Sequence, residues 1–465
     1  MKGKKKVLKN LNAPIDMTMG TPWKSIVQFT IPMLIGNIAQ QLYSTVDSIV
    51  VGKYIGDNAL AAVGSAMPIL NMLLVLFIGI SAGAGVMVAQ FFGARDRRSL
   101  SYTVGNSITV TAIACVILVA VCAPFIRPVL VVLNTPDSIL DWCTDYLMIS
   151  LIGMAGMAYY NILSGVLRGM GDSFSSLIFL LVATAINIGL DIFFVAVVKM
   201  EVAGVALATI IAQVVSATLC LLKLSRMKEQ LDFGLKYLVP RKLYTMTIIK
   251  LGLPSGLTQA IFSSAMLVVQ SLTNQFGEAF IAANVVVMRV DGFAMMPNFS
   301  FGTALTTYAG QNVGAGLYDR VTKGAKQGTF MAVGCSAVIT GIILLLGKPL
   351  MGVFTDTKSL VDLSYRLMCI LAVGYIAVAV TQSLSGIMRG AGDTVTPMWI
   401  SLISTIALRV PIAYGISFFT RTESLPNGQQ ECIQISLLIS WIMGAVLTVI
   451  FYRLGKWKNK AINRK

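Results

Sequence analysis

Two aspartates lie deep inside apolar stretches of this sequence. Asp47 belongs to QQLYSTVDSIVVG, near the end of an apolar run that begins at about Ile26, and Asp191 belongs to AINIGLDIFF. A charged side chain at membrane depth costs at least about 2.5 kcal/mol, so an acid in such a place needs a partner or a function. Carboxylates in these surroundings are suited to binding a proton or a hard cation.

Amide and hydroxyl side chains accompany both aspartates. Gln40 precedes Asp47 by two helical turns, so the two side chains share one helix face. Asn187 precedes Asp191 by four residues and shares a face with it in the same way. Thr209 lies in the next apolar run. Counted from the charged residues at the outer ends of these runs, Asp47, Asp191 and Thr209 lie about 9 to 12 Å deep, given the helical rise per residue.

These side chains predict one coupling-ion site in the first half of the chain. Protonation of an acid, or capture of Na⁺ by its oxygens, removes net charge from a dry place and can shift the balance between two conformations. The alternative is that both acids line a wet vestibule or pair with a basic group. No Lys or Arg lies in the interior of the predicted spans of this half, which argues against pairing. The predicted site for Na⁺ or H⁺ comprises Gln40, Asp47, Asn187, Asp191 and Thr209, with Asp47, Asn187, Asp191 and Thr209 as the candidate Na⁺ ligands.

A different polar set lies in the second half. Arg289 and Asp291 are near mid-membrane in one apolar run, and Arg409 is comparably deep in another. Two interpretations stay open: a structural charge network, and a role in substrate binding or gating. The chain also has 24 methionines, a side chain that suits pliable binding surfaces. The candidate substrate or gating residues are Tyr43, Met288, Arg289, Asp291, Met295 and Arg409.

The elements that carry these residues must cross a membrane. The chain has 465 residues, 56% hydrophobic and 12% charged, with a mean hydropathy of +0.79, which is far outside the range of soluble domains. A helix needs about 20 residues to cross the hydrocarbon core, and this rule predicts twelve spans. Pro32 in the first span is a candidate hinge, and Pro254 occupies nearly the matching place in the second half. The spans lie near residues 26–51, 59–88, 103–125, 139–162, 174–198, 203–223, 247–275, 280–307, 329–347, 362–385, 396–419 and 433–453.

The placement of Lys and Arg sets the expected orientation. With both termini in the cytoplasm, cytoplasmic segments hold 27 basic residues and the outer loops hold seven. The expected location is therefore the inner or plasma membrane, where the net charge of +16 faces anionic lipid and not nucleic acid. The predicted parts are a cytoplasmic N-terminal segment (1–25), an N-lobe (26–223), a cytoplasmic linker (224–246), a C-lobe (247–453) and a basic cytoplasmic tail (454–465).

The sequence also repeats itself. SGVLRGMGD at 164–172 returns as SGIMRGAGD at 385–393, with six of nine positions identical and an offset of 221 residues. Gln90 returns as Gln311 at the same offset. Because each unit holds six spans, the two copies keep one orientation and are parallel repeats. The predicted fold class is an all-α integral membrane protein with twelve transmembrane helices in two parallel six-helix repeats.

The repeated GxGD raises a remote alternative, an intramembrane aspartyl protease. Asp172 and Asp393 follow arginines at the cytoplasmic ends of their spans, whereas Asp47 and Asp191 lie toward the outside, so no close pair of catalytic acids is expected. A tight turn whose aspartate caps the next helix explains the motif better. The absence of histidine from the sequence excludes Ser-His-Asp hydrolysis, and no enzymatic activity is expected.

The chain resembles the multidrug and toxic compound extrusion (MATE) family. VDSIVVGKYIG, the paired RGxGD turns and MRVDGFAMMPNFSFGTALTTYAGQNVGAG carry the likeness, which covers nearly the whole chain. It implies a V-shaped, two-lobed fold and an exporter that exchanges Na⁺ or H⁺ for organic, often cationic, compounds by alternating access. In similar members the N-lobe cation site uses residue types that appear here as Gln40, Asp47, Asn187, Asp191 and Thr209.

One family feature is missing, and one rival function stays open. A subgroup places a glutamate in span seven and an aspartate early in span ten, but GLTQAIFSSAMLVVQ and LAVGYIAVAVTQ contain no acid, so coupling is expected in the N-lobe. The rival is a lipid-linked glycan flippase, which would need several cations along the cleft, whereas only Arg289 and Arg409 lie deep. The expected partners are cationic or amphipathic organic compounds and membrane lipid, for a monomer with no cofactor beyond Na⁺ or H⁺.

Overall fold

The chain folds almost entirely into helices. The computed structural model describes residues 14–133, 135–423 and 425–462, and the side chains of residues 44, 47–49, 57 and 60 lie outside the described part. Within these residues the one extended pairing is an isolated antiparallel bridge between Thr422 and Leu425. The all-α prediction is confirmed.

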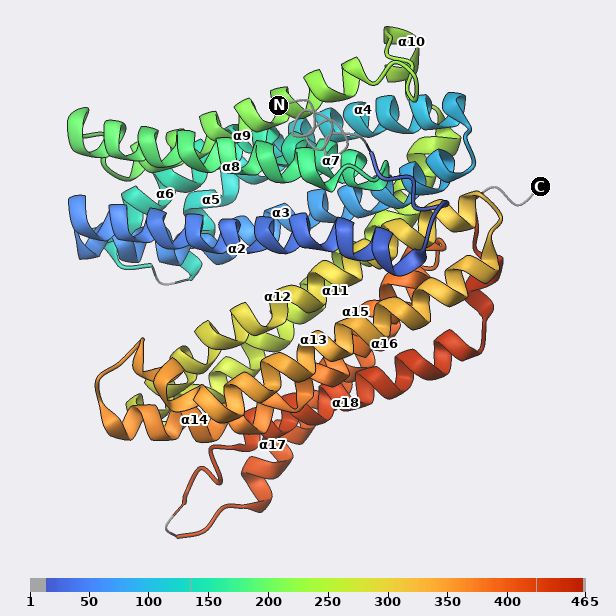
Figure 1. Ribbon diagram of the computed structural model, residues 1–465. Helices are drawn as coiled ribbons and strands as arrows, with labels where there is room; N and C mark the ends of the chain where they lie inside the picture. The colour runs from blue at the N-terminus through green and yellow to red at the C-terminus, as the bar shows by residue number, and fades with distance from the viewer. Residues whose placement is uncertain (1–13, 134, 424, 463–465) are drawn as a thin grey trace, which may run out of the picture. The chain divides into compact units, whose positions relative to one another are not determined.

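The helices of the first half pack side by side in a bundle (Figure 1). Short 3₁₀ and π segments, η1 (Ala123–Phe125) and η2 (Phe193–Val197), continue α4 and α8 respectively. The helices are α2 (Pro22–Tyr54), α3 (Asp57–Gly93), α4 (Arg97–Cys122), α5 (Ile126–Val132), α6 (Asp137–Ile152), α7 (Met154–Gly169), α8 (Ser173–Ile192) and α9 (Glu201–Arg226).

The helices of the second half follow the one-turn helix α10 (Leu235–Leu238), which lies in the connection between the halves. A π-helical segment, η4 (Leu402–Leu408), joins α16 to α17, and the 3₁₀ segments are η3 (Asn274–Phe276) and η5 (Lys456–Asn459). The helices are α11 (Lys242–Thr273), α12 (Glu278–Gly314), α13 (Tyr318–Gly352), α14 (Lys358–Ala372), α15 (Gly374–Gly390), α16 (Val395–Ser401), α17 (Arg409–Phe419) and α18 (Cys432–Arg453).

The lengths and composition of these helices confirm a fold with twelve spans. Within the described residues, nine helices are long and apolar enough to cross a membrane by themselves. Two further spans are helix pairs, α6 with α7 and α14 with α15, which bend by 48° and 44°. The remaining span is α2, a helix of 33 residues that carries some of the undescribed side chains. The bends in the fourth and tenth spans were not predicted from hydropathy.

The described chain divides into two compact units. Unit 1 comprises residues 14–16 and 31–256, and unit 2 comprises residues 17–30 and 257–462. Two of these divisions fall inside a helix, one between Thr30 and Ile31 in α2 and one between Gly256 and Leu257 in α11. Each division lies within three residues of the proline inside that helix, Pro32 in α2 and Pro254 in α11.

Matching small residues bring matching helices together in the two units. In unit 1 a Cβ atom on Gly169 of α7 would lie 2.7 Å from the carbonyl oxygen of Gly85 in α3. In unit 2 a Cβ atom on Gly390 of α15 would collide with the carbonyl oxygen of Thr306 in α12. Both residue pairs are related by the 221-residue offset found in the sequence. The repeat therefore extends from the motifs to an equivalent close helix contact in each unit.

Candidate functional site

Three polar side chains from three helices meet inside unit 1. The hydroxyl oxygens of Tyr43 in α2 and Thr209 in α9 lie 3.2 Å apart and share a hydrogen bond. Asn187 in α8 donates from Nδ2 to the same Thr209 Oγ1 at 3.3 Å. The Asn187 side chain is fully buried. Thr209 is therefore the junction through which α2, α8 and α9 are connected.

Asp191 extends this group by one helical turn. It follows Asn187 by four residues on α8, and its side chain is 0% exposed, so the two buried polar side chains share one face of the helix as predicted. The regular helix ends at Ile192, and the π segment η2 begins at the next residue. Short π segments are uncommon and occur frequently at functional sites. We call Tyr43, Asn187, Asp191 and Thr209 the polar cluster.

Helix α2 carries the other predicted members of this site. The backbone of Asp47 is helical and lies one turn beyond Tyr43, on the same face, while its side chain is outside the described residues. The Gln40 side chain is exposed on α2. Pro32 lies in the first third of the helix, whose backbone stays helical around it. The roles assigned to Gln40, Asp47 and Pro32 stay predictions.

The polar cluster consists of groups that carry oxygen. Hydroxyl, amide and carboxylate oxygens are the ligands of hard cations, and a buried carboxylate is also a natural proton acceptor. Within the residues that the structure describes, no group of three or more His, Cys, Asp or Glu is placed to hold a metal ion. The donor chemistry of the cluster therefore fits one Na⁺ or one proton better than a transition metal.

Unit 2 holds a separate hydrogen-bonded pair. Tyr375 in α15 is fully buried and donates its hydroxyl hydrogen bond to Asp291 Oδ1 in α12 at 2.9 Å. Arg409 begins α17, and among the described residues no hydrogen bond or ion pair joins it to Asp291. Asp291 and Arg409 are expected from the sequence at similar depth, whereas Tyr375 is not among the predicted residues. The signal that was available is a lone phenol in the apolar stretch LAVGYIAVAV.

The remaining candidate residues of the second half lie apart from this pair. Arg289 is exposed, and among the described residues no hydrogen bond or ion pair joins it to Asp291. The Met288 side chain is 41% exposed, and its sulfur accepts a weak contact from Asn284. Met295 packs against the buried core of unit 2. Of the three residues predicted to form a network, Asp291 is the one with a side-chain hydrogen bond among the described residues, and its partner is Tyr375.

The repeat places an arginine in unit 2 beside the position of an amide in unit 1. Leu408 lies 221 residues after Asn187, and Arg409 is its next neighbour. Unit 2 thus has a cation in the interior of a span, whereas the sequence of the first half provides no Lys or Arg in the interior of its spans. This difference favours unit 1 as the place where a mobile cation is needed.

The repeated RGxGD motif forms a turn that caps a helix. Asp172 is the N-cap residue of α8 and accepts hydrogen bonds from the Ser175 backbone N–H at 2.9 Å and hydroxyl at 2.8 Å. Asp393 accepts in the same way from the Thr396 backbone N–H at 3.2 Å and hydroxyl at 2.7 Å. The preceding Gly171 has φ of +91°, a conformation that favours glycine. The capping role predicted for the motif is confirmed, and it accounts for both aspartates without catalysis.

Comparison with known proteins gives the same family twice within the chain. The MatE family model matches residues 32–193 and again residues 254–415. The "Probable multidrug resistance protein YoeA" of Bacillus subtilis (strain 168) is 28% identical over 451 residues, which is 95% of this chain and 96% of that protein. The "Probable multidrug resistance protein NorM" of Thermotoga maritima is 26% identical over 453 residues, which is 94% of each chain.

Solved structures share the fold. A structure described as "Crystal structure of MATE in complex with MaL6" matches with a TM-score of 0.88 and 23% identity, covering 95% of this chain and 98% of that chain. At this sequence identity the match supports the arrangement of helices. It does not identify a substrate.

Proposed function

Because this chain belongs to the MatE family, we propose that it is a secondary active exporter of small organic compounds in the plasma membrane. The single observation that carries the proposal is the end-to-end match to relatives named as multidrug resistance proteins. A lipid-linked glycan flippase would need several deep basic residues along its cleft. In this sequence only Arg289 and Arg409 lie near mid-span, which argues against that function. Both termini lie in the cytoplasm, as the distribution of Lys and Arg indicates.

The proposed coupling site is the polar cluster together with Asp47. An outward-open state takes up Na⁺ or H⁺ at Asp191 and Asp47, and neutralisation of these acids stabilises a rearranged unit 1 that releases the exported compound. Departure of the ion to the cytoplasm restores the charged state and resets the cycle. The buried position of Asp191, with Asn187 and Thr209 bonded beside it, supports this role. Cationic or amphipathic compounds are the proposed substrates, because they compete with the ion for acidic surroundings.

The hinge that such a cycle needs is proposed at Pro32. A proline inside a helix removes a backbone hydrogen bond, so the helix bends there at lower cost than elsewhere. The position of the unit division between Thr30 and Ile31 supports this choice. The equivalent division beside Pro254 supports a matching flexible point in the second repeat.

Transport in proteoliposomes tests the proposal. We expect the parent protein to drive ethidium movement under an imposed Na⁺ or pH gradient. Asp191→Asn and Asp47→Asn keep the shape of each side chain but remove its charge, and each should lower gradient-driven transport by at least about tenfold, which equals about 1.4 kcal/mol. Asp137→Asn, an exposed acid of α6, is the matched control and should transport like the parent.

Two results would count against the proposal, and they are distinguishable. Ethidium movement that ignores both gradients in the parent protein would contradict ion coupling altogether. Gradient-driven movement that survives Asp191→Asn at the parent rate would keep ion coupling but remove the polar cluster as its site.

A further inference from the structure

The connection between the two repeats is a folded element docked on α4. Its residues 227–241 run from the end of α9 to the start of α11 and include α10. Leu231 and Tyr237 are buried, at 2% and 6% exposure. The fully buried Asn106 of α4 donates to the carbonyl oxygen of Tyr237 at 3.2 Å and accepts from the backbone N–H of Arg241 at 2.7 Å. One amide side chain therefore holds the connection both within α10 and just after it.

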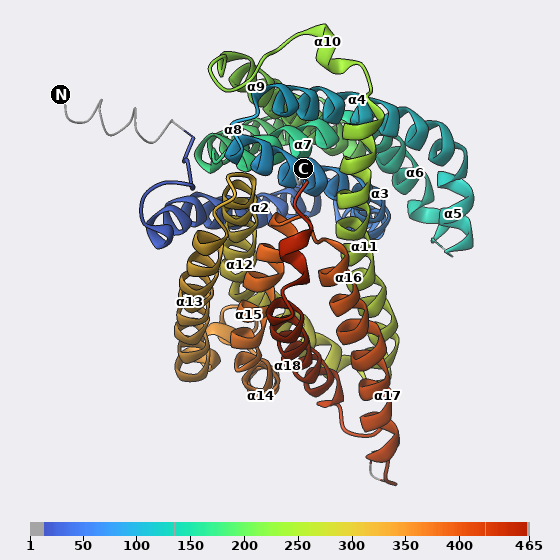
Figure 2. The same cartoon turned by 90° about the vertical axis from the view of Figure 1, so that its right-hand side faces the viewer.

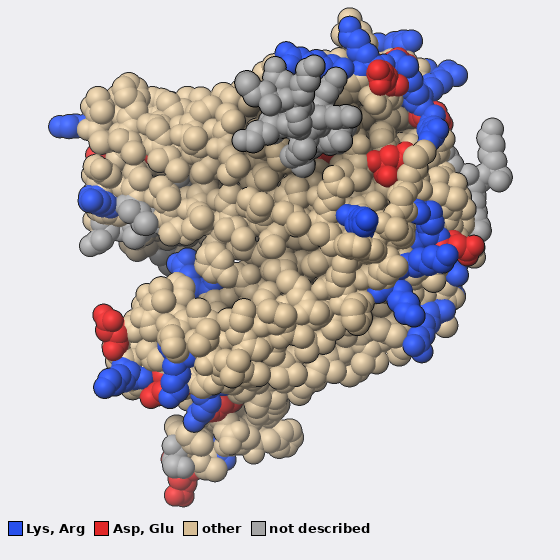
Figure 3. Space-filling view, in the orientation of Figure 1, with Lys and Arg blue, Asp and Glu red and all other residues tan. Residues whose placement is uncertain are grey.

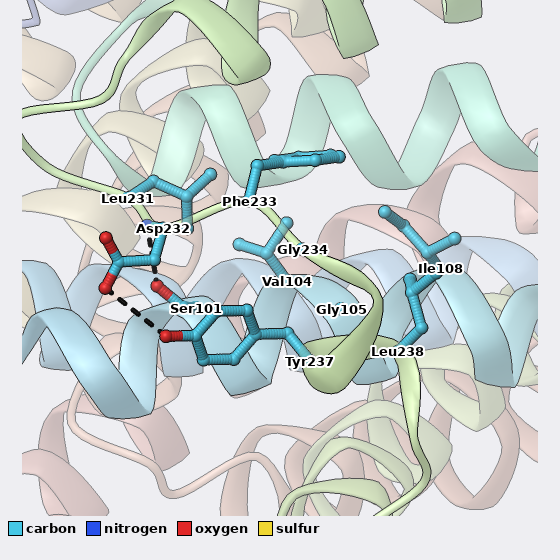
Figure 4. Close-up of a pocket in the computed structure, with 10 residues that line it drawn as sticks. All are labelled: Ser101, Val104, Gly105, Ile108, Leu231, Asp232, Phe233, Gly234, Tyr237 and Leu238. Carbon is cyan, nitrogen blue, oxygen red and sulfur yellow. Dashed lines mark hydrogen bonds between the residues drawn. The ribbon is translucent and has the colours of Figure 1, made fainter.

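The acidic side chain of Asp232 in the connection is hydrogen-bonded and ion-paired. Figure 4 shows the two hydrogen bonds that join Asp232 to Tyr237 and to Ser101. The Tyr237 hydroxyl donates to Asp232 Oδ2 at 3.3 Å, and the Asp232 backbone N–H donates to Ser101 Oγ at 2.9 Å. Arg97 of α4 forms an ion pair with Asp232 Oδ1 at 2.5 Å. The side of the connection that faces α4 is thus well packed and electrostatically balanced.

Three large apolar side chains of the connection and of the first turn of α11 are exposed. Leu235 is 83% exposed, Leu243 is 70% exposed and Val239 is 59% exposed, whereas Phe233 lines a pocket against α4 (Figure 4). These side chains are not needed to hold the connection on α4, because Leu231 and Tyr237 already do so. A cluster of large exposed apolar side chains of this kind marks an interaction surface.

Cations are interleaved with these apolar side chains. Lys236, Arg241 and Lys242 are exposed within the same stretch, and Lys228 precedes it. Apart from the paired Asp232, the one acid in residues 227–243 is Glu229. We name Leu235, Lys236, Val239, Lys242 and Leu243 the linker patch.

The linker patch lies where two membrane spans end. Helix α9 ends at Arg226 and α11 begins at Lys242, and both are long and apolar enough to cross a membrane, so we expect residues 227–241 near the lipid headgroups. Figures 1 and 2 both show α10 beyond the end of α9 at the edge of unit 1, next to α4. Figure 3 shows Lys and Arg side chains gathered over this end of unit 1.

We propose that the linker patch is a docking surface for the anionic phospholipids of the cytoplasmic leaflet. Its apolar side chains enter the boundary of the acyl chains while Lys236 and Lys242 pair with headgroup phosphates, which is the arrangement of an interfacial anchor. The charge complementarity selects lipid as the occupant. A purely apolar partner surface would leave both lysines desolvated without counter-charges. The proposal rests on the orientation given above but not on the coupling-ion site.

Tryptophan fluorescence in nanodiscs tests the depth of the patch. Leu235→Trp is introduced into the full chain, and the parent signal is subtracted to remove the five native tryptophans. The exposure of Leu235 makes this substitution compatible with the fold. In discs that contain brominated phosphatidylglycerol, the introduced indole should emit at shorter wavelength and lose about half of its intensity by contact quenching, because it lies at the interface. In brominated phosphatidylcholine discs the quenching should be clearly weaker.

A charge-reduced variant separates the role of the lysines. With Lys236→Gln and Lys242→Gln added, the difference in quenching between the two lipids should fall by about twofold or more, since two headgroup contacts are lost. The matched control removes two exposed cations from α13 instead, by Lys323→Gln and Lys326→Gln, and should keep the lipid difference.

Three results would overturn the proposal. Water-like emission without quenching would place the patch outside the leaflet. Emission at shorter wavelength without quenching would show a protein occupant, such as a second copy of the chain. Equal quenching in both lipids would remove the preference for anionic headgroups.

Discussion

Thr209 connects three helices through one hydroxyl group. Its oxygen is bonded to Tyr43 of α2 and to Asn187 of α8, and Asp191 lies one turn from that amide. Under the proposed function, an ion bound near Asp191 would act on a hydrogen-bond network that reaches α2, the helix with the proposed hinge. A hydrogen bond of this kind contributes about 1 kcal/mol net.

A double-mutant cycle on Tyr43→Phe and Thr209→Val tests this connection. Each substitution removes one hydroxyl, and each should raise the concentration of Na⁺ or H⁺ that gives half-maximal transport. Because the two hydroxyls bond to each other, the double variant should be less impaired than the sum of the single variants, with a coupling energy of about 0.5 to 1.5 kcal/mol.

The matched control for this cycle is Tyr159→Phe. The Tyr159 hydroxyl donates to the carbonyl oxygen of Ile108 at 3.2 Å, elsewhere in unit 1. Its removal should leave the ion dependence of transport unchanged and should add independently to Thr209→Val. Strict additivity between Tyr43→Phe and Thr209→Val would contradict the connection through Thr209.

At this scale the sequence predicted which residues lie together along one helix, and missed partners between helices. The shared face of Asn187 and Asp191 follows from helical spacing alone. The bond from Tyr375 to Asp291 joins α15 to α12, and no local pattern encodes the rotation of one helix against another. Tyr43 was chosen as a substrate or gating candidate, and the structure bonds it to Thr209 in the polar cluster.

At the scale of elements, the segment before α2 is held in place by one arginine of unit 2. Arg320 in α13 donates to the carbonyl oxygens of Met17 at 3.0 Å and Gly20 at 2.8 Å, and to Asn312 Oδ1 at 3.0 Å. The fully buried Met17 also donates its backbone N–H to Gln311 Oε1 at 2.9 Å. Charged hydrogen bonds of this type contribute about 1.5 to 3 kcal/mol each.

Arg320→Ala should therefore loosen residues 17–20. Amide hydrogen exchange at Met17 should accelerate by at least about tenfold, because local opening no longer breaks the charged hydrogen bonds. Arg95→Ala is the control in the neighbouring stretch, since Arg95 forms only a 4.0 Å ion pair with Asp16 and its side chain is 73% exposed. Exchange at Met17 that is equally slow in both variants would show that Arg320 does not hold the segment.

Hydropathy predicted every span but not its shape. Hydropathy measures the length of an apolar run. It therefore cannot predict the breaks at Gly153 and Val373 inside the fourth and tenth spans. The π segments beside Asp191 and Arg409 could not be predicted for the same reason. The docking of α10 on α4 uses hydrogen bonds from Asn106 and Thr109 to residues more than 100 positions away in the sequence.

At the scale of the whole molecule, equivalent glycine substitutions in the two repeats should have equivalent effects on packing. Gly169→Ala and Gly390→Ala each place a methyl group against the backbone of the facing helix, α3 in one case and α12 in the other. Each variant should lose about 1 to 3 kcal/mol of stability, since overpacking forces backbone shifts. The melting temperature of the purified protein should fall in both variants.

Glycines with open surroundings provide the controls for this pair. Nothing lies within 4 Å of a Cβ atom built on Gly64 or Gly334, both of which are in helices. Gly64→Ala and Gly334→Ala should leave the melting temperature unchanged or raise it, because alanine favours helix by about 1 kcal/mol. A fall in only one of the two repeat-related variants would mean that the close helix contact is not equivalent in the two halves.

Arg409 bears on how two copies of one ancestral segment could diverge. A duplicated gene starts with two sets of the same chemistry, and both copies begin under the same selection. The second copy now has a fixed cation, Arg409, in the same unit as Asp291, whereas the interior of the predicted spans of the first copy has no Lys or Arg. With the polar cluster as the proposed coupling site, the energy stored across the membrane would enter the molecule through the copy that holds Asp191.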